Sequence, residues 1–446
     1  MKCSDCEMKT SLKSIHLFLL LSSLLLLGCT GRTPVKEIKE QSTSPSTATI
    51  AASPLPVTLS PSPSPPAPTS TQLPFYQLLW IYQTGGAIWG TALISNGIAY
   101  VGSDDGNLYA LEARTGDLKW KFHTGGLVRS RPVIFNGLIY FSSDDGYLYA
   151  VNAQSAQQVW RVDIGNFSDQ VKRENPGTNP DPTGFDYLQS SPVVYEDQVY
   201  IGSADGNVYA LKAASGQISW TFKTGQKVRA TPIIDNGILY IGSWDGTVYA
   251  LDAKTGRGNW QIPIGGQIQT TALVCNGLVY TASRKASVVA LDAQTGRLIW
   301  EFDYGHNNWV ESSPVLDGKL IYIGSSGNQY IVGLNSESGE LNTEYLDYVF
   351  YWSTPVITGK ELYIGAEANT KTSPKGGLYG FELPSQVNFE GQSPIRLKWK
   401  FTLTDTLMPD GNWAGVAASP VISDHVIYFG GLDGKFYAIF LINYQN

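Results

Sequence analysis

A repeat of about 40 residues is the feature that most constrains the fold of this chain. Six tryptophans follow one another at spacings of 40, 40, 60, 40 and 40 residues: Trp80, Trp120, Trp160, Trp220, Trp260 and Trp300. A tyrosine in segments such as IYIGS marks the same unit eight times: Tyr100, Tyr140, Tyr200, Tyr240, Tyr280, Tyr322, Tyr363 and Tyr428. Because a fixed period of this length is typical of repeat architectures, we expect eight copies of one small structural unit.

Each copy is predicted to form four short strands. In the fourth copy, TPIID ends at Asn-Gly, ILYIGS at Asp-Gly and TVYALDA at Thr-Gly, and the last strand begins near the tryptophan. Asn-Gly and Asp-Gly between apolar runs favour type I′ hairpin turns, whose two central residues both need a positive φ. Four-stranded antiparallel sheets in radial array form a β-propeller. The sequence therefore predicts an all-β, eight-bladed propeller.

The two ends of the repeat region complement each other. The eighth copy stops at Asn446, before its fourth strand, and FYQLLWIYQTG near residue 75 supplies a single strand that carries Trp80. We expect this N-terminal strand to complete the last blade, because closure removes two sheet edges that would otherwise be open to pairing.

The first 74 residues are predicted to target and tether the propeller. Lys9 and Lys13 precede an apolar core at residues 15–27, which is typical of a signal peptide and is too short for a membrane span. We assign residues 1–28 to the signal peptide, with translation starting at Met1 or Met8. Residues 29–74 are rich in Pro, Ser and Thr and carry no aromatic residue from Thr30 onward, so we expect a disordered tether before a propeller at 75–446.

The end of the apolar core has a further pattern. LLGC at residues 26–29 resembles the lipobox of bacterial lipoproteins, in which the cysteine receives the lipid. The resemblance implies lipid attachment at Cys29 and an exported, membrane-anchored protein at the periplasmic face or the cell surface.

Composition excludes several functions. The net charge is −7 and the body has no run of Lys or Arg, so nucleic acid is not an expected partner. After processing, Cys29 carries the lipid and Cys275 alone remains in the body, which excludes an intramolecular disulfide or a cysteine metal cluster. The histidines His123, His306 and His425 are scattered, and we predict no metal site and no cofactor.

Five segments carry the resemblance to a known family. LDAKTGRGNW, LDAQTGRLIW, LEARTGDLKW, VNAQSAQQVW and LKAASGQISW resemble the tryptophan-docking motif of PQQ-like, quinoprotein-type eight-bladed propellers. The resemblance covers residues 75–446, and the sixth copy departs from it with Thr343. It implies that the docking tryptophans pack between neighbouring blades: Trp80, Trp120, Trp160, Trp220, Trp260, Trp300 and Trp399.

The polar residues that repeat with this motif are interpreted as turn residues. Asp245 and Gly246 form one turn of the fourth copy, and Thr255 and Gly256 form another. The same role is expected of Asp104, Asp105, Asp144, Asp145, Asp205 and Asp433, so no acid/base pair is inferred from them.

Function is expected from what does not repeat. The connections from fourth to first strand and from second to third strand emerge on one side, which we call the variable face. The long connections at 164–188, 305–310, 366–377 and 407–413 all fall there. The five tryptophans outside docking positions also fall there: Trp89, Trp244, Trp309, Trp352 and Trp413. Exposed aromatic residues suit recognition, but these tryptophans could instead plug the central channel.

The position two before each Ser-Pro-like pair is predicted to line the channel mouth. It is occupied by Trp89, Arg129, Gln189, Arg229, Gln269, Glu311, Trp352 and Ala417. Two interpretations remain open, namely a small anion between Arg129 and Arg229, or a solvated funnel. The candidate recognition face comprises Trp89, Arg129, Arg229, Trp244, Trp309, Glu311, Trp352 and Trp413.

Two function classes compete, with a small-ligand or glycan-binding surface module as a third. The first is a non-enzymatic scaffold, similar to the BamB-type lipoproteins of outer-membrane β-barrel assembly. The second is a dehydrogenase that binds pyrroloquinoline quinone over a calcium ion. Such enzymes carry two adjacent cysteines beside the cofactor, and this chain has no such pair. We therefore predict a non-enzymatic, monomeric scaffold that binds envelope or membrane proteins through the variable face.

Overall fold

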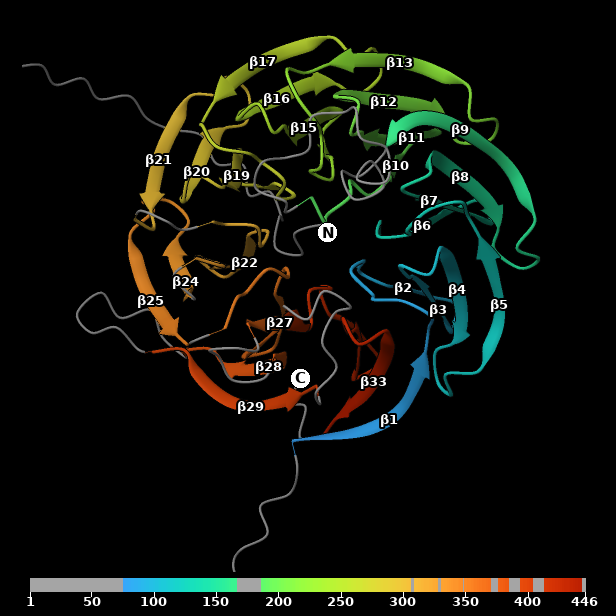
Figure 1. Cartoon of the computed structure of the whole chain (residues 1–446). Helices are drawn as coiled ribbons and strands as arrows, with labels where there is room; N and C mark the ends of the chain where they lie inside the picture. Colours follow the sequence, from blue (N-terminus) through green and yellow to red (C-terminus); the bar gives the residue numbers. More distant parts are fainter. Residues whose placement is uncertain are drawn as a thin grey trace, which may run out of the picture. The chain divides into compact units, whose positions relative to one another are not determined.

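The computed structural model describes residues 75–166, 186–305, 309–327, 330–347, 349–369, 376–384, 394–403 and 413–442. These residues form eight β-sheets, each built from antiparallel strands, arranged as a ring around a central channel (Figure 1). The predicted all-β, eight-bladed propeller is thus confirmed. The described residues contain no helix long and apolar enough to span a membrane. The predicted signal peptide, Cys29 and the tether lie outside the described residues.

Blades 1 to 4 follow one another along the chain. Blade 1 contains β2 (Leu93–Ser95), β3 (Ile98–Gly102), β4 (Asn107–Glu112) and β5 (Leu118–His123), and blade 2 contains β6 (Val133–Phe135), β7 (Leu138–Ser142), β8 (Gly146–Asn152) and β9 (Gln158–Asn166). Blade 3 contains β10 (Val193–Tyr195), β11 (Gln198–Gly202), β12 (Asn207–Lys212) and β13 (Ile218–Lys223), and blade 4 contains β14 (Ile233–Asp235), β15 (Ile238–Gly242), β16 (Thr247–Asp252) and β17 (Gly258–Pro263).

Blades 5 to 8 complete the ring. Blade 5 contains β18 (Leu273–Cys275), β19 (Leu278–Ser283), β20 (Ser287–Asp292) and β21 (Leu298–Asp303), and blade 6 contains β22 (Val315–Asp317), β23 (Leu320–Gly324), β24 (Tyr330–Asn335) and β25 (Leu341–Leu346). Blade 7 contains β26 (Val356–Thr358), β27 (Glu361–Asn369), β28 (Gly377–Glu382) and β29 (Arg396–Thr402), and β30 (Trp413–Gly415) pairs with β27. Blade 8 contains β31 (Val421–Ser423), β32 (Val426–Gly430), β33 (Lys435–Leu441) and β1 (Tyr76–Gln83).

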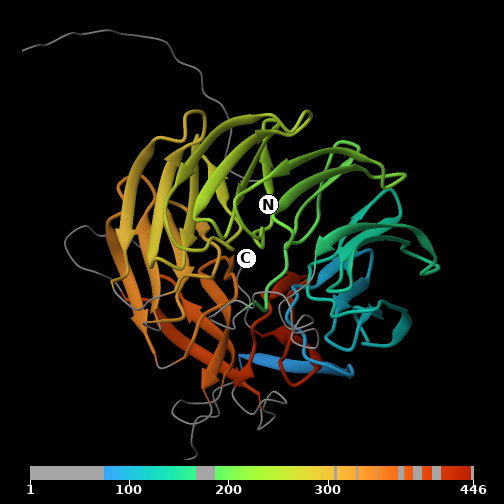
Figure 2. The ribbon, with the colours of Figure 1, turned by 45° about the horizontal axis from the view of Figure 1, so that its top comes forward.

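The ring closes through strands from the two ends of the repeat region. β1 pairs antiparallel with β33, from Tyr76 opposite Leu441 to Gln83 opposite Lys435. In Figure 1, β1 takes the peripheral place in blade 8 that β5, β9 and β13 take in blades 1 to 3. Figure 2 shows the same ring tilted, with its sheets side by side around the axis. The predicted closure by the N-terminal strand is therefore confirmed.

The Asn-Gly turns have the predicted geometry. Both central residues have a positive φ, for example 51° at Asn96 and 75° at Gly97, as a type I′ turn requires. These turns join the first and second strands of a blade, so they lie on the side opposite the variable face, which we call the turn face.

The Asp-Gly turns differ from the predicted type I′ geometry. Gly106 has a positive φ of 82°, but the aspartate before it does not. The Gly106 N–H donates to the Ser103 carbonyl (3.1 Å), and the Ser103 N–H donates to the Asn107 carbonyl (3.0 Å), which together define a three-residue loop. The Asp105 carboxylate explains this choice, because it accepts the Asn107 N–H at 3.0 Å within the same loop.

The turn aspartates also join neighbouring blades. Asp105 accepts the Gly85 N–H at 2.7 Å from the connection that follows β1, together with the Tyr109 hydroxyl. Asp245 accepts the Gly225 N–H in the same way, also at 2.7 Å. Burial alone would raise the pKa of Asp105, but the hydrogen bonds from Tyr109 and Gly85 hold it below its usual value. The carboxylates of Asp105, Asp145 and Asp245 thus fasten blades 1, 2 and 4 to the blades before them, whereas blade 5 carries Lys285 at this position.

Tryptophan and tyrosine, the two sequence markers, meet at the blade interfaces. The Trp160 indole N–H donates to the Ala213 carbonyl at 2.9 Å, and the Tyr140 hydroxyl donates to the same carbonyl at 3.1 Å. Trp260 and Tyr240 share the Ala293 carbonyl in the same way. At these interfaces the marker pair binds one backbone group of the next blade along the ring, whereas in blade 7 the Tyr363 hydroxyl donates to Glu361 of its own blade.

Glycine is required where the tryptophan ring packs on the next blade. Gly256 has a φ of 72°, and a Cβ placed on it would lie 2.6 Å from the Trp220 ring. A side chain at this position would therefore be strained and would displace the indole. In blade 6 the docking position holds Thr343, which is fully buried.

Blade 7 has a long second strand that continues toward the variable face. β27 continues four residues past Gly365, and its end pairs with β30 through Glu367 opposite Gly415. Glu367 also forms a bridge with Phe350. The connection from blade 6 to blade 7 and the connection from blade 7 to blade 8 thus both pair with β27.

Candidate functional site

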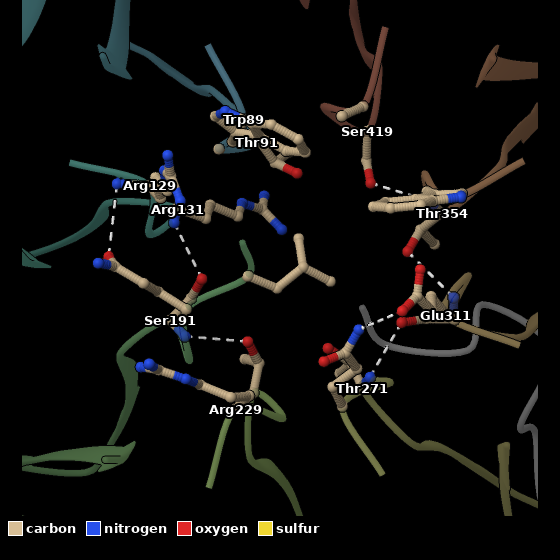
Figure 3. A pocket seen from close by; sticks show the side chains of 18 residues that line it. Trp89, Thr91, Arg129, Arg131, Ser191, Arg229, Thr271, Glu311, Thr354 and Ser419 are labelled. Carbon is tan, nitrogen blue, oxygen red and sulfur yellow. Dashed lines mark hydrogen bonds between the residues drawn. The ribbon is translucent and has the colours of Figure 1, made fainter. Parts of the chain in front are cut away.

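The channel-lining residues form two rings. The upper ring contains the eight predicted channel-mouth positions: Trp89, Arg129, Gln189, Arg229, Gln269, Glu311, Trp352 and Ala417. The lower ring lies two residues further along each chain segment and contains Thr91, Arg131, Ser191, Thr231, Thr271, Ser313, Thr354 and Ser419. Together they enclose a cavity of about 100 Å³ (Figure 3).

The upper ring is closed by an apolar cluster. Trp89 and Tyr187 stack with their ring centres 4.8 Å apart and their planes 9° from parallel. Trp352, Ala417 and Leu432 complete the cluster. Trp89 is 4% exposed and Trp352 is 8% exposed. These two tryptophans therefore occupy the upper end of the channel, the alternative that the sequence left open.

The lower ring is accessible to solvent. Arg131 is exposed, and Thr91, Ser191, Thr231 and Thr271 are half-buried. The first strands run from the lower ring toward the Asn-Gly turns of the turn face. Because the upper end is filled by buried side chains, the cavity opens toward the turn face.

The two upper-ring arginines are paired with carboxylates. Arg129 makes two bonds of 2.7 Å to the oxygens of Asp104, and Arg229 makes bonds of 2.7 and 2.6 Å to those of Asp186. Burial would raise the pKa of Asp186, but the charge and hydrogen bonds of Arg229, with help from Lys227, hold it below its usual value. Bidentate pairing of this kind occupies the guanidinium fork, so a small anion between Arg129 and Arg229 would compete with both carboxylates.

The opposite side of the ring is acidic. The Glu311 Oε1 atom accepts bonds from Arg284 (2.8 Å) and Gln269 (2.8 Å), while its Oε2 atom has no partner among the described residues. Glu367 is fully buried, and neither of its carboxylate oxygens has a hydrogen-bond partner in the described part of the chain. Burial, reinforced by the charge of Glu311, raises the pKa of Glu367 to about 8.

A row of alternating cations and rings crosses the variable face from blade 4 to blade 6. The Lys227 ammonium lies 5.0 Å from the Trp244 ring centre, and the Arg284 guanidinium lies 5.4 Å from Trp244 and 5.0 Å from Trp309. We call Lys227, Trp244, Arg284 and Trp309 the cation-aromatic row. Trp244 is buried and the Arg284 side chain is 5% exposed, while Lys227 and Trp309 are half-buried. Lys227 therefore supplies the exposed charge of the row, and Trp309 supplies its exposed aromatic surface.

The candidate recognition residues thus divide into two groups. Trp89, Arg129, Arg229, Glu311 and Trp352 come together as buried members of the upper ring, whereas Trp244 and Trp309 belong to the cation-aromatic row. The backbone of Trp413 belongs to β30, and its side chain lies outside the described residues. So do most of the insertions at 164–188, 366–377 and 407–413.

Sequence reasoning missed several residues of the channel. Asp186 and Tyr187 lie at the end of the blade 3 insertion, and Glu367 lies in the extension of β27. Asp104 was assigned to a turn, yet it pairs with Arg129. Arg131 had a visible signal, because the other seven copies carry Ser or Thr at its position.

Metal and cofactor binding can be tested against these residues. The described residues contain no group of three or more His, Cys, Asp or Glu side chains placed to hold a metal ion. A tricyclic quinone needs a slot with an open apolar face, whereas Trp89 and Trp352 are buried and the cavity of about 100 Å³ is below the roughly 300–1,000 Å³ of ordinary ligand pockets. The described residues therefore do not fit that cofactor.

The fold and the docking interfaces define a PQQ-like eight-bladed propeller. The family model described as outer membrane protein assembly factor BamB matches residues 77–181, 170–271 and 262–443, and the chain belongs to this family. No curated protein matches the chain.

Solved structures with the same fold include a BamB, a designed protein and a dehydrogenase. BamB from Moraxella catarrhalis is 22% identical, with a TM-score of 0.54 over 64% of this chain and 84% of its own. The designed protein Ika8 is 16% identical, with a TM-score of 0.58 over 81% and 98%. Quinohemoprotein alcohol dehydrogenase from Comamonas testosteroni is 12% identical, with a TM-score of 0.60 over 83% and 78%. At these identities the similarity shows the fold alone.

Proposed function

We propose that this protein is a non-enzymatic, lipid-anchored scaffold of the bacterial cell envelope that takes part in the assembly of outer-membrane proteins. Membership of the family described as outer membrane protein assembly factor BamB supports this role. The observation that carries the proposal is the filled upper end of the channel. Since Trp89, Tyr187 and Trp352 are buried there, the variable face presents a filled surface instead of an open ligand pocket. Such a surface suits contact with another protein.

The cation-aromatic row is the part of this surface that we assign to partner binding. Aromatic and arginine side chains dominate the binding energy of protein interfaces. Trp309 is half-buried, so it retains area that a partner can cover, whereas the Arg284 side chain is only 5% exposed and supports Trp309 from below. The contact between them, 5.0 Å from cation to ring centre, holds the two side chains in place before binding. The partner we expect is an envelope or membrane protein.

Lipid attachment at Cys29 is the second part of the proposal. It would keep the propeller at a membrane while the segment 29–74 gives it reach. A Cys29→Ser variant should lose membrane association and leave the thermal unfolding of the propeller unchanged, as measured by fractionation and a thermal melt. Membrane association that persists in this variant would contradict the anchor.

Partner binding is tested by using the protein to capture partners from solubilised envelopes, and we expect it to capture outer-membrane assembly proteins. Trp309→Ala should remove about 2 to 4 kcal/mol of binding if Trp309 is a hot spot. Leu298→Ala is a matched control, because Leu298 is 47% exposed but lies on the peripheral strand β21. Equal capture by both variants, or a catch without outer-membrane assembly proteins, would contradict the proposed role.

A further inference from the structure

One position of the lower ring breaks its pattern. Seven blades place a hydroxyl group there, and blade 2 places Arg131 instead. Figure 3 shows the Arg131 side chain extending toward the centre of the ring, while that of Arg229 turns away from it. A single cation is thus added to a ring that is otherwise neutral.

Arg131 has no counter-ion among the residues that the structure describes. Arg129, Arg229 and Arg284 each pair with a carboxylate. The Arg131 guanidinium makes no hydrogen bond or ion pair with any residue that the structure describes. The surrounding protein lowers the pKa of Arg131 through desolvation, because neighbouring groups partly screen the cation from water. Its side chain is nevertheless exposed within the channel, so a ligand can reach it.

The hydroxyl groups of the lower ring are oriented by the neighbouring blades. The Ser191 Oγ atom accepts the Arg131 N–H at 2.9 Å, and the Thr231 Oγ1 atom accepts the Ser191 N–H at 3.0 Å. On the other side of the ring, the Oγ atoms of Ser313 and Ser419 accept backbone N–H groups at 2.9 Å. Each of these hydroxyls acts as an acceptor, which leaves its proton to donate.

We propose that the lower ring is a binding site for an oxyanion, a carboxylate or phosphate group that enters from the turn face and pairs with Arg131. A guanidinium fork beside hydroxyl donors suits the two or three oxygens of such a group. The cavity of about 100 Å³ admits a group of this size. The group belongs either to a free small anion or to the end of a larger molecule. This site opens away from the variable face, so it is independent of the proposed scaffold role.

The test measures binding of sodium phosphate and sodium acetate to the full-length protein by calorimetry at constant ionic strength. Arg131→Thr gives blade 2 the residue type of the other blades, and we expect it to weaken binding at least tenfold. Arg257→Thr is the control, because Arg257 is an exposed turn residue, and it should bind like the wild type. Equal affinities of wild type and Arg131→Thr would overturn the proposal.

A second arm separates the two sources of the oxyanion and needs no variant. A short peptide with a free C-terminal carboxylate is compared with the same peptide carrying a C-terminal amide. Binding of phosphate or acetate indicates a free anion, and binding of the acid peptide alone indicates the end of a larger molecule. Each bound probe should also raise the melting temperature of the wild type, because a ligand of the native state stabilises it. If no probe binds the wild type, the proposal is wrong.

Discussion

The blade interfaces repeat one contact from blade to blade, whereas the channel places different residues at equivalent positions. At the interfaces one contact recurs with little change, since the indole N–H to carbonyl distance is 3.0 Å at Trp120 and 2.9 Å at Trp220 and Trp300. In the channel, equivalent positions carry different groups, from Arg229 to Glu311. Because the interfaces hold the ring together, the channel positions are free to differ from blade to blade.

The largest loss of stability is expected for substitution of a docking tryptophan. Trp300 is 8% exposed, bonds to the Ser336 carbonyl and packs on Gly339. Trp300→Ala should lower the free energy of unfolding by about 3 to 5 kcal/mol, through lost burial and the cavity left behind. Trp309→Ala, nine residues away on the variable face, should cost much less. Urea unfolding of both variants checks this, and equal losses would show that the two regions do not differ.

Glu367 gives the next effect, which depends on pH. Its pKa is about 8 in the folded protein against 4.5 as the ordinary value. Below pH 4.5 both states are protonated and the stabilising contribution is complete. As the pH rises from 4.5 to about 8, only the unfolded state loses the proton, so the free energy of unfolding falls by about 1.4 kcal/mol for each pH unit. Above pH 8 the contribution is lost.

Glu367→Gln should remove this slope, because glutamine keeps the shape without the ionisation. The variant should gain stability over the wild type between pH 5 and pH 8, as measured by urea unfolding at each pH. Glu337→Gln is the control, since Glu337 is exposed in a turn, and it should keep the slope. Parallel pH profiles of wild type and Glu367→Gln would show that the carboxyl group is not protonated in the fold.

The framework was predictable because its determinants are local. The Asn-Gly turns and the docking tryptophans can each be recognised within one repeat, and the closing strand β1 follows from comparing the first and last copies of that repeat. The Asp-Gly loops were assigned to the wrong turn type, because the choice depends on bonds from the Asp105 side chain that the dipeptide alone does not reveal.

The channel was predictable only in part. Counting from the Ser-Pro-like pairs located all the upper-ring residues, since the repeat fixes their position. Their partners come from other connections, such as Asp186 for Arg229 and Glu367 beside Glu311. No spacing in the sequence links these residues, so the pairing and burial that decide their chemistry required the folded ring.

The smallest loss of stability is expected in the lower ring, where channel residues also form contacts between blades. Ser191 accepts the Arg131 N–H and donates its own N–H to Thr231, so it joins blades 2, 3 and 4. Ser191→Ala removes one neutral bond near solvent and should cost about 0.5 to 1.5 kcal/mol, as thermal melts can measure. Ser423→Ala is the control, because the Ser423 hydroxyl bonds only to the adjacent Asp424 in the described structure. A loss of stability as large as that of Trp300→Ala would mean that the lower ring helps to hold the blades together. The presence of Arg131 in place of a hydroxyl residue would then affect the packing of the blades as well as the charge of the channel.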